Sequence, residues 1–341
     1  MKPESLLGLR ADATLTDKLH VIAQAVLRAS DDRDSELQWL YLDYRPTNGL
    51  SFKLGRQRIP LFQFSEAIDV GFAYPWISLP LVVYDSFLFT DYDGLLGTYE
   101  FSTHSFSGAI DAYYGEFNGE VNFTNRDFDI EVRDLAGITG SAYVGQFNFR
   151  ASYHRAAASV GLDDLQPFAQ TLRQLGFANS AKSIEINDTA IIRQLSAGWE
   201  NVDYFARIEF SQLNSSAFFI ERTNSYYISV GYNFYPFVAH ATLGKSKSKN
   251  ATAPNEIPLG IDPQLDFLAQ QLDVVQGSIS LPDLETTSLG LRYDFRTNIA
   301  FKVDLTFTRE EQFTFSQNGE RLGAGTFSNA ELLQVGMEWV F

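Results

Sequence analysis

The last ten residues of the chain, LLQVGMEWVF (332–341), alternate between apolar and polar side chains. The apolar set is Leu333, Val335, Met337, Trp339 and Phe341, and the other parity holds Gln334, Gly336 and Glu338, with Leu332 and Val340 as apolar exceptions. Successive side chains of a β-strand point to opposite faces, so this stretch predicts a strand with one apolar and one mostly polar face. The fold therefore depends on what the apolar face contacts.

The same two-residue period recurs along the chain. It is found in SLLGLRADATLT (5–16), KLHVIAQAVLRA (18–29), QFNFRASYHR (146–155), VDYFARIEFS (202–211), SYYISVGYNF (225–234), SLGLRYDF (288–295) and IAFKVDLTFT (299–308). Each segment has about ten residues, the length that a tilted strand needs to cross a bilayer. Many apolar sets begin or end with an aromatic residue, which is typical of strands at membrane interfaces.

Two kinds of structure explain this alternation. In a soluble all-β protein, half-buried strands alternate because one face packs on a core. In a membrane barrel, one face meets lipid and the other lines an aqueous interior. Charged side chains recur at mid-strand on the polar parity, and tight connections alternate strictly with long ones. The pattern therefore favours a transmembrane antiparallel β-barrel, whose closed sheet satisfies the backbone groups in lipid.

Composition excludes several classes of function. The 341-residue chain has a formal net charge of −16, which argues against a nucleic-acid partner. It has no cysteine, which excludes disulfides and thiolate catalysis. Its four histidines show no metal-binding spacing, and we predict no metal site and no cofactor. No apolar run reaches the roughly 18–20 residues of a spanning helix, and without a GxSxG motif or a convincing Ser, His and acid cluster we predict no enzyme.

The connections predict the topology of a single domain over residues 1–341. Tight links of two to five residues alternate with longer links at about 30–35, 59–92, 117–132, 157–183, 212–223, 246–284 and 309–330. The fifteen predicted strands are 6–16, 19–29, 35–45, 50–58, 93–102, 106–117, 133–143, 146–156, 184–199, 202–212, 223–234, 237–246, 286–296, 299–309 and 332–341. Short turns on one side and long loops on the other are typical of an outer-membrane barrel with periplasmic turns.

An odd strand number is unusual, because bacterial single-chain barrels are even-stranded. The opening MKPESLLGLRAD (1–12) also lacks the apolar region and the cleavage site of a signal peptide. Taken alone, this opening suits a cytosolic protein, and it equally suits a mature or truncated chain. We therefore expect a sixteen-stranded parent, of which the first strand and the signal peptide are missing here.

Four stretches, taken in order and spacing, carry a family resemblance. They are LGLRADATLTDKLHVIAQAVLRAS (7–30), GLSFKLGRQR (49–58), DYDGLLGTYEF (91–101) and the ending EWVF (338–341). Together they resemble the general porins of Gram-negative bacteria. The first is similar to the second and third porin strands, and the next two resemble the strands that flank the porin constriction loop. The ending is similar to the signal read by the barrel assembly machinery, with Trp339 and Phe341 as its residues.

The resemblance implies a location and a function. It implies a water-filled channel in the cell outer membrane for passive diffusion of small hydrophilic solutes and ions. It also implies a homotrimer surrounded by outer-membrane lipid and lipopolysaccharide. A channel specific for one solute on the same fold remains an alternative. A barrel enzyme or a soluble β protein would be a third or fourth alternative.

The link PLFQFSEAIDVGFAYPWISLPLVVYD (60–85) resembles a porin subgroup rather than the best-known enteric porins. Its three prolines break strand pairing, and it is rich in aromatic residues. An exposed loop of this composition would be a sticky patch, so we expect residues 59–92 to fold into the lumen. By resemblance this link is the constriction loop, and a subunit contact or a lid is the alternative.

Parity places a set of charged side chains on the inward face. The basic members are Arg10, His20, Arg28, Arg150, Arg207, Arg292 and Lys302, and the acidic members are Asp12, Asp111, Glu209, Asp294, Asp304 and Glu338. The family implies a basic wall facing an acidic loop at the narrowest point. The predicted wall is Arg10, Arg28, Arg56 and Arg58, and the predicted acidic set is Glu66, Asp69, Asp85 and Asp93.

Two predicted wall residues conflict with the parity rule. Arg56 and Arg58 share the parity of the apolar Leu54, so an unbroken strand would point them to lipid, where a charge is costly. Either Gly55 marks a bulge that turns the following side chains, or the strand has ended there. The resemblance favours an inward Arg56.

A run of alternating lysines, KSKSK (245–249), stands where a strand enters a long loop. Two interpretations fit it. A solvated charge run is the simpler one, and a contact with lipopolysaccharide phosphates is the other.

Overall fold

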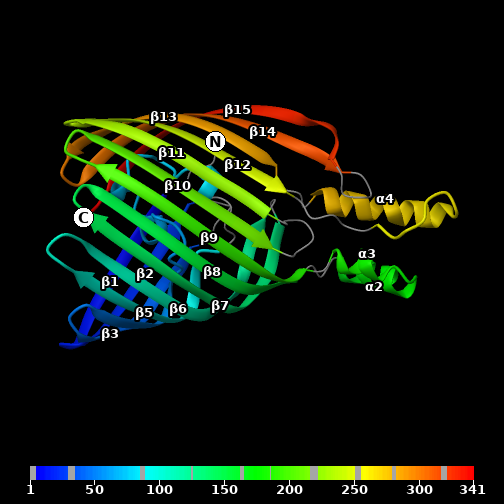
Figure 1. Cartoon of the computed structure of the whole chain (residues 1–341), viewed down its shortest axis with the longest axis horizontal. Helices are drawn as coiled ribbons and strands as arrows, with labels where there is room; N and C mark the ends of the chain where they lie inside the picture. The colour runs from blue at the N-terminus through cyan, green and yellow to red at the C-terminus, as the bar shows by residue number, and fades with distance from the viewer. Residues whose placement is uncertain are drawn as a thin grey trace.

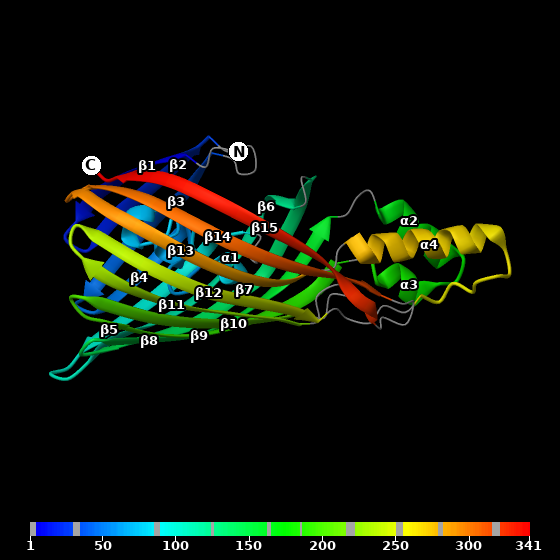
Figure 2. The same ribbon diagram turned by 90° about the horizontal axis from the view of Figure 1, so that it is seen from above.

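The computed structural model describes residues 5–29, 35–84, 89–123, 126–161, 165–184, 186–215, 222–249, 255–278, 282–315 and 321–341. These residues form one antiparallel sheet of fifteen strands, in which each strand pairs with its neighbours in sequence. The sheet curls strongly about its long axis (Figures 1 and 2). In the part of the chain that the structure describes, no ladder joins the first strand to the last. Within those ranges no helix has the length and apolar character of a membrane span.

The predicted fifteen-stranded antiparallel sheet is confirmed. The strands are β1 (Leu6–Thr16), β2 (Leu19–Arg28), β3 (Glu36–Thr47), β4 (Leu50–Arg58), β5 (Asp91–Ser102), β6 (Ser107–Phe123), β7 (Arg126–Val144), β8 (Phe147–Gly161), β9 (Ile186–Glu200), β10 (Tyr204–Ser215), β11 (Arg222–Phe234), β12 (Phe237–Lys249), β13 (Asp283–Arg296), β14 (Ile299–Phe315) and β15 (Arg321–Trp339). The long links expected at 117–132 and 309–330 are wrong, because β6–β7 and β14–β15 continue as paired hairpins.

An irregularity allows β6 and β7 to continue. The register of their ladder shifts between Gly115 and Phe117, opposite Asp134, which has a φ of 49°. Asp134 also accepts a hydrogen bond from the Tyr114 hydroxyl at 2.7 Å. The extra residue absorbs the change in twist, so pairing resumes beyond it. A bilayer sets the minimum length of a spanning strand and not its maximum, which is why crossing length alone misses this extension.

The apolar row of the C-terminal strand lies on the exposed face of the sheet. Leu333, Val335 and Met337 are 55%, 73% and 60% exposed. In β11 the same rule holds, because Ile228 is exposed whereas its neighbour Ser229 is fully buried. The apolar face that the sequence predicts is therefore the outer face of the curled sheet.

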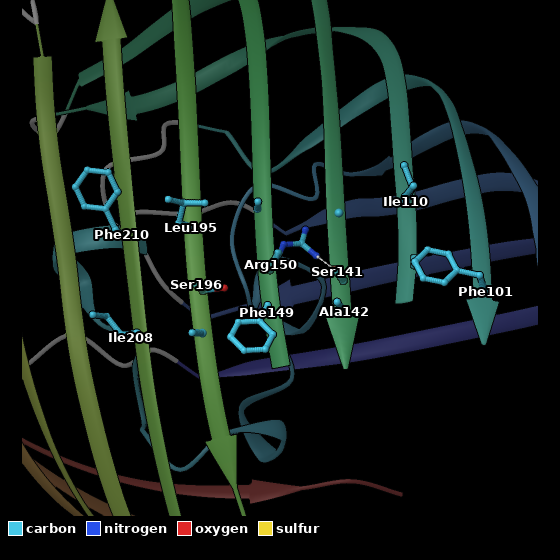
Figure 3. Close-up of a pocket in the computed structure, with 14 residues that line it drawn as sticks. Phe101, Ile110, Ser141, Ala142, Phe149, Arg150, Leu195, Ser196, Ile208 and Phe210 are labelled. Atoms are coloured by element: carbon cyan, nitrogen blue, oxygen red, sulfur yellow. Dashed lines mark hydrogen bonds between the residues drawn. The ribbon is translucent and has the colours of Figure 1, made fainter. Parts of the chain in front are cut away.

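A shallow apolar hollow of about 520 Å³ lies across β5 to β10 (Figure 3). Bulky outer-face side chains such as Phe149 and Leu195 flank it, and small residues such as Gly140 line it. Arg150, from the opposite parity of β8, donates to the Ser141 hydroxyl at 3.4 Å. The hollow is thus part of the apolar outer wall.

The main apolar core lies on the other face of the sheet. It forms between the strands and a stretch that we call the packed segment, Ile59–Tyr84, which contains the turns η1 (Ser65–Ala67) and η2 (Gly71–Ala73) and the helix α1 (Leu81–Tyr84). The segment contributes Ile59, Leu61, Phe62, Tyr74, Trp76, Leu79, Val82, Val83 and Tyr84, and the strands contribute Tyr92, Leu96, Tyr113, Ile130, Val132, Leu135, Ile192 and Tyr227. The aromatic residues that made an exposed loop implausible are buried here.

Three helices lie beyond the long-loop end of the strands (Figures 1 and 2). They are α2 (Gln166–Gln174), α3 (Ala178–Lys182) and α4 (Pro263–Ser278), and they share a small core of their own. Glu256 joins the two loops, because its carboxylate accepts from the backbone N–H of Asn179 at 3.0 Å. The sequence analysis places both stretches in long links.

Candidate channel lining and constriction

The packed segment is hydrogen-bonded to several strands around the curled sheet. At its start, the Pro60 carbonyl accepts from Arg150 Nη2 at 2.7 Å and from the Thr139 hydroxyl at 3.2 Å. The next carbonyl, of Leu61, accepts from the Ser152 hydroxyl at 3.0 Å. Backbone carbonyls without a regular partner are therefore satisfied by polar side chains of β7 and β8. This is the inward parity that the sequence assigned to Arg150.

Glu209 of β10 is the central attachment point. Its side chain is fully buried. Its two oxygens accept from the Gln63 backbone N–H at 2.8 Å, the Tyr84 hydroxyl at 2.7 Å and the Gln194 side-chain amide at 2.9 Å. One carboxylate thus holds both ends of the packed segment to the strand wall. The parity rule places Glu209 inward, and the contacts show why a charge is tolerated there.

The middle of the segment is held by β13 and β14. Lys302 Nζ donates to the carbonyls of Gly71 at 2.6 Å and Trp76 at 2.7 Å. Asp304 Oδ2 accepts from the Ile77 backbone N–H at 2.7 Å. Arg292 Nη1 donates to the Phe72 carbonyl at 2.8 Å. Charged side chains that the sequence assigns to the lumen therefore bind the segment backbone, and they are not simply solvated.

Asp69 is the carboxylate that joins the segment to the basic wall. It accepts from Arg28 Nη2 at 2.8 Å, Arg58 Nη2 at 2.5 Å and Gln38 Nε2 at 2.9 Å. Burial by itself would raise the pKa of Asp69, but the two guanidinium groups and the amide outweigh it and lower the pKa below its ordinary value of 3.8. The carboxylate is therefore charged at neutral pH. Two of the four predicted wall arginines meet one of the four predicted acids at this point.

The structure places Arg56 and Asp93 differently from the sequence prediction. Asp93 lies within β5 and not on the packed segment, and it accepts from Arg56 Nη2 at 2.8 Å across the β4–β5 ladder. The pair shares its parity with the exposed Leu54 and Leu95. Gly55 has a φ of 130°, yet the β3–β4 pairing keeps its register past it. No bulge therefore turns Arg56 inward.

Arg58 differs from Arg56 because β4 ends at Arg58. Arg58 still pairs with Asp91 of β5, so the second alternative of the sequence analysis, a strand that has ended at Gly55, does not hold, although the Arg58 side chain contacts Asp69. Arg10 pairs along its own strand with Asp12, with Nε and Oδ2 3.1 Å apart. Glu66 is exposed in η1, and Asp85 lies outside the described residues.

A polar cavity of about 390 Å³ separates Glu66 from the wall of β1 to β5. Its lining is Arg10, Asp12, His20, Ile22, Trp39, Tyr41, Asp43, Arg45, Lys53, Gln57, Arg58, Glu66 and Leu96. Arg10 lies 5.5 Å above the Trp39 ring, and Lys53 Nζ lies 5.5 Å above the Tyr41 ring. The cavity combines charges of both signs with aromatic faces.

The sequence analysis does not name eight of these lining residues, namely Ile22, Trp39, Tyr41, Asp43, Arg45, Lys53, Gln57 and Leu96. Trp39, Tyr41, Asp43 and Arg45 stand at every second position of β3, and Lys53 faces Asp43 across the β3–β4 ladder. Their shared parity was the signal available in the sequence. The inner row of β3 is aromatic before it becomes charged, so in the sequence it resembles an apolar row.

The chain terminus lies just past β15. Phe341 is 76% exposed, and its ring centroid is 5.3 Å from that of Trp339. The Val340 backbone N–H donates to the Asn298 carbonyl at 3.0 Å, which fixes the end beside the β13–β14 turn. Within the described ranges, no three His, Asp or Glu side chains gather as a metal site.

Comparisons with known proteins place the fold. No protein-family model matches the chain, and a search among curated proteins found no match. Among solved structures, it is similar to a loop-L8 deletion mutant of the Vibrio cholerae outer membrane protein OmpT, with a TM-score of 0.57 and 12% identity over 99% of this chain and 91% of that one. It is also similar to the outer membrane channel DcaP of Acinetobacter baumannii, with a TM-score of 0.56 and 9% identity over 98% and 84%.

A third similar structure is Salmonella typhi OmpF in complex with daunomycin, with a TM-score of 0.52 and 12% identity over 98% of this chain and 91% of that one. At these identities the likeness concerns the fold alone. The chain has an outer-membrane porin-type fold, and the resemblance predicted from its sequence is confirmed at that level.

Proposed function

We propose that the chain is an outer-membrane channel through which small hydrophilic solutes and ions diffuse passively. The observation that carries this proposal is the division of most strands into an exposed apolar row and an inner row that holds charged or polar side chains. Lipid suits the first row and water the second. No catalytic group is needed, because a channel works by the width and charge of its lining.

In this proposal the packed segment narrows the conduit. It fills the space against β7 to β15, where Glu209 and Lys302 hold it. The polar cavity beside Glu66 is then the narrow passage: Arg10, Arg58 and Glu66 belong to its lining, and the buried Asp69 joins Arg58 to Arg28. Opposite charges on the two sides create a field across the passage that orients dipolar solutes.

A sixteenth strand would close the sheet. Each strand is antiparallel to the next one in the sheet. The first and the last of fifteen such strands, β1 and β15, therefore run in the same direction. Every residue of β1 is exposed, on both parities. Unpaired backbone groups are costly in lipid, and one strand antiparallel to both edges satisfies them. We include this strand in the proposed membrane form.

The remaining partners belong to the same proposal. The outer face would contact outer-membrane lipid and lipopolysaccharide, and copies of the chain would associate as a homotrimer. The exposed Trp339 and Phe341 would be read by the barrel assembly machinery during insertion. The porin-type fold is what supports each of these proposals.

The test is single-channel recording with the folded chain in planar lipid bilayers. We expect discrete, stable current steps that scale with salt concentration. Folding is established beforehand by strand content in circular dichroism and by altered gel mobility without heating. A folded sample that gives no steps would contradict the proposal.

A channel specific for one solute is the second candidate. The aromatic faces of Trp39 and Tyr41, which stand beside charges in the polar cavity, favour it. Liposome swelling with a series of sugars of increasing size separates the two candidates. A cut-off set by size alone supports general diffusion, and saturation by one solute supports the specific channel.

A further inference from the structure

The helix α4 exposes large apolar side chains on the face that its own core does not use. Ala269 and Leu272 are buried in the small core that α4 shares with α2 and α3. Phe267 and Val274 stand seven residues apart, so they share one face of the helix, which is turned away from that core. Their side chains are 59% and 71% exposed.

Two apolar residues before the helix extend this face. Leu259 and Ile261 are exposed, and the backbone N–H of Gly260, which lies between them, donates to Asp266 Oδ1 at 2.7 Å. This bond fixes both residues beside the first turns of α4. We call Leu259, Ile261, Phe267 and Val274 the α4 ridge. The rise of a helix separates its last two members by roughly 10 Å.

Lipid accounts for the exposed apolar rows of the strands but not for the α4 ridge. The apolar rows lie on the outer face of the curled sheet, whereas α4 lies beyond the long-loop end of the strands (Figures 1 and 2). The ridge residues therefore meet water. Exposed apolar surface bordered by polar residues marks a contact site for another molecule.

Acidic side chains flank the α4 ridge. Asp266 and Asp273 each come one residue before a ridge residue, so they form a second row along the helix. Residues 255–278 hold four carboxylates and no Lys, Arg or His. In the part of the chain that the structure describes, Asp266 and Asp273 form no ion pair, and Asp273 accepts from the neutral Asn255 Nδ2 at 3.1 Å. A partner of this surface therefore needs positive charges beside an apolar face.

Hydrogen bonds hold the α4 ridge in place without a partner. Glu256, which leads into α4, accepts from the backbone N–H groups of Asn179 at 3.0 Å and Ser180 at 3.4 Å. Its own backbone N–H donates to the Ser180 hydroxyl at 2.9 Å. These bonds join α3 to the chain that precedes α4. A surface that is already ordered loses less conformational entropy on binding.

We propose that the α4 ridge binds a cationic amphipathic helix of a partner protein. The apolar face of such a helix covers Phe267 and Val274, and its Lys or Arg side chains pair with Asp266 and Asp273. A second copy of α4 fits less well, because two acidic rows would meet with like charge. In the proposed outer-membrane form the ridge lies outside the cell, and the proposal does not depend on conduction.

The probe is a fluorescent synthetic helix of about 18 residues, built from Leu and Lys so that one face is apolar and the other cationic. It is titrated against the full chain, folded in nanodiscs of zwitterionic phosphatidylcholine, and followed by fluorescence anisotropy. Empty nanodiscs give the background. The unaltered chain should bind the peptide in a saturable manner above that background.

Two double variants separate the apolar and the charged parts of the contact. Phe267→Ser/Val274→Ser should bind the peptide roughly 30-fold more weakly, because both apolar contacts are lost. Asp266→Asn/Asp273→Asn keeps the ridge and the core of the helices. It should bind roughly fivefold more weakly at low salt, and the difference should shrink at high salt.

The short-turn end of the strands supplies matched controls. Val202→Ser/Tyr235→Ser removes two apolar side chains that are each 88% exposed. Asp17→Asn/Asp203→Asn removes two exposed carboxylates. Both control variants should bind the peptide like the unaltered chain.

Three outcomes would overturn the proposal. Equal weakening in a ridge variant and its matched control would mean a general effect of surface composition. Equal binding of a peptide in which Glu replaces Lys would mean that charge has no part. Self-association of the chain that Phe267→Ser/Val274→Ser abolishes, seen by analytical ultracentrifugation without peptide, would make a second copy the occupant. Single-channel conductance should be the same in all these variants, so a failure of this site is distinguishable from a failure of the channel.

Discussion

Replacing Glu209 by alanine should lower the free energy of unfolding by about 3–5 kcal/mol, the range seen when one member of a buried polar network is removed. The change leaves the Gln63 N–H, the Tyr84 hydroxyl and the Gln194 amide without their shared acceptor. Tyr84 and Gln194 are themselves buried, so water does not readily replace the lost acceptor. Urea unfolding in detergent, followed by strand circular dichroism, measures the loss.

Glu209→Gln is the matched control. It keeps the shape and one acceptor oxygen, so it should retain more than half of the stability that alanine loses. Because Glu209 holds both ends of the packed segment, Glu209→Ala should also broaden the single-channel current levels. Equal stability of Glu209→Ala and the unaltered chain would show that the segment is held elsewhere, for example by Lys302.

Replacing Asp69 by asparagine should shift the reversal potential in a salt gradient towards anion preference. Arg58, which lines the passage, loses its counter-charge, and Arg28 keeps only Glu36, whose Oε1 is 3.9 Å from its Nη2. One unit charge at about 4 Å in a watery passage is worth about 1 kcal/mol, so we expect a roughly fivefold fall in the cation-to-anion permeability ratio. The control Asp203→Asn, at a tight turn on the far end, should leave the ratio unchanged.

The pH dependence of selectivity follows from the same carboxylate. The pKa of Asp69 is lowered, so its charge and the stabilisation that the charge brings are present above its ordinary value of 3.8 and are lost only as the pH falls below it. Unaltered channels should therefore keep the Asp69 contribution between pH 7 and pH 4. A loss of the difference between Asp69→Asn and the unaltered chain already at pH 5 would contradict the assignment.

Local alternation predicts the strands of this protein well, because most of them carry an apolar row on the exposed face and a polar row on the other. The limits are physical. The extensions of β6 and β7 exceed the roughly ten residues that a bilayer crossing needs, and they depend on the irregularity at Asp134. The helices α2 and α4 are separated by about 90 residues in the sequence and share one small core. The sequence of either helix taken alone does not predict that core.

In the candidate site, too, the sequence predicts some features and not others. Parity assigns Glu209, Arg292 and Lys302 inward correctly, but it gives no hint that they bind backbone groups of a distant segment. The link between Asp69 and Arg28 came from family resemblance, since no local pattern pairs residues 41 positions apart. Parity alone predicts the outward placement of Arg56 that the structure shows, whereas the resemblance favours an inward one.

The most direct test of the account compares two neighbouring residues of β4. The chain has no cysteine, so Lys53→Cys and Leu54→Cys each introduce a single thiol. Lys53 lines the polar cavity, and Leu54 is 58% exposed on the apolar face. A charged, membrane-impermeant thiol reagent added to open channels in a bilayer should react with Lys53→Cys and reduce the current in steps. Leu54→Cys should stay unmodified, with its current unchanged; modification of Leu54→Cys at the same rate, or no change for Lys53→Cys, would contradict a lipid-facing outer row and a water-filled interior.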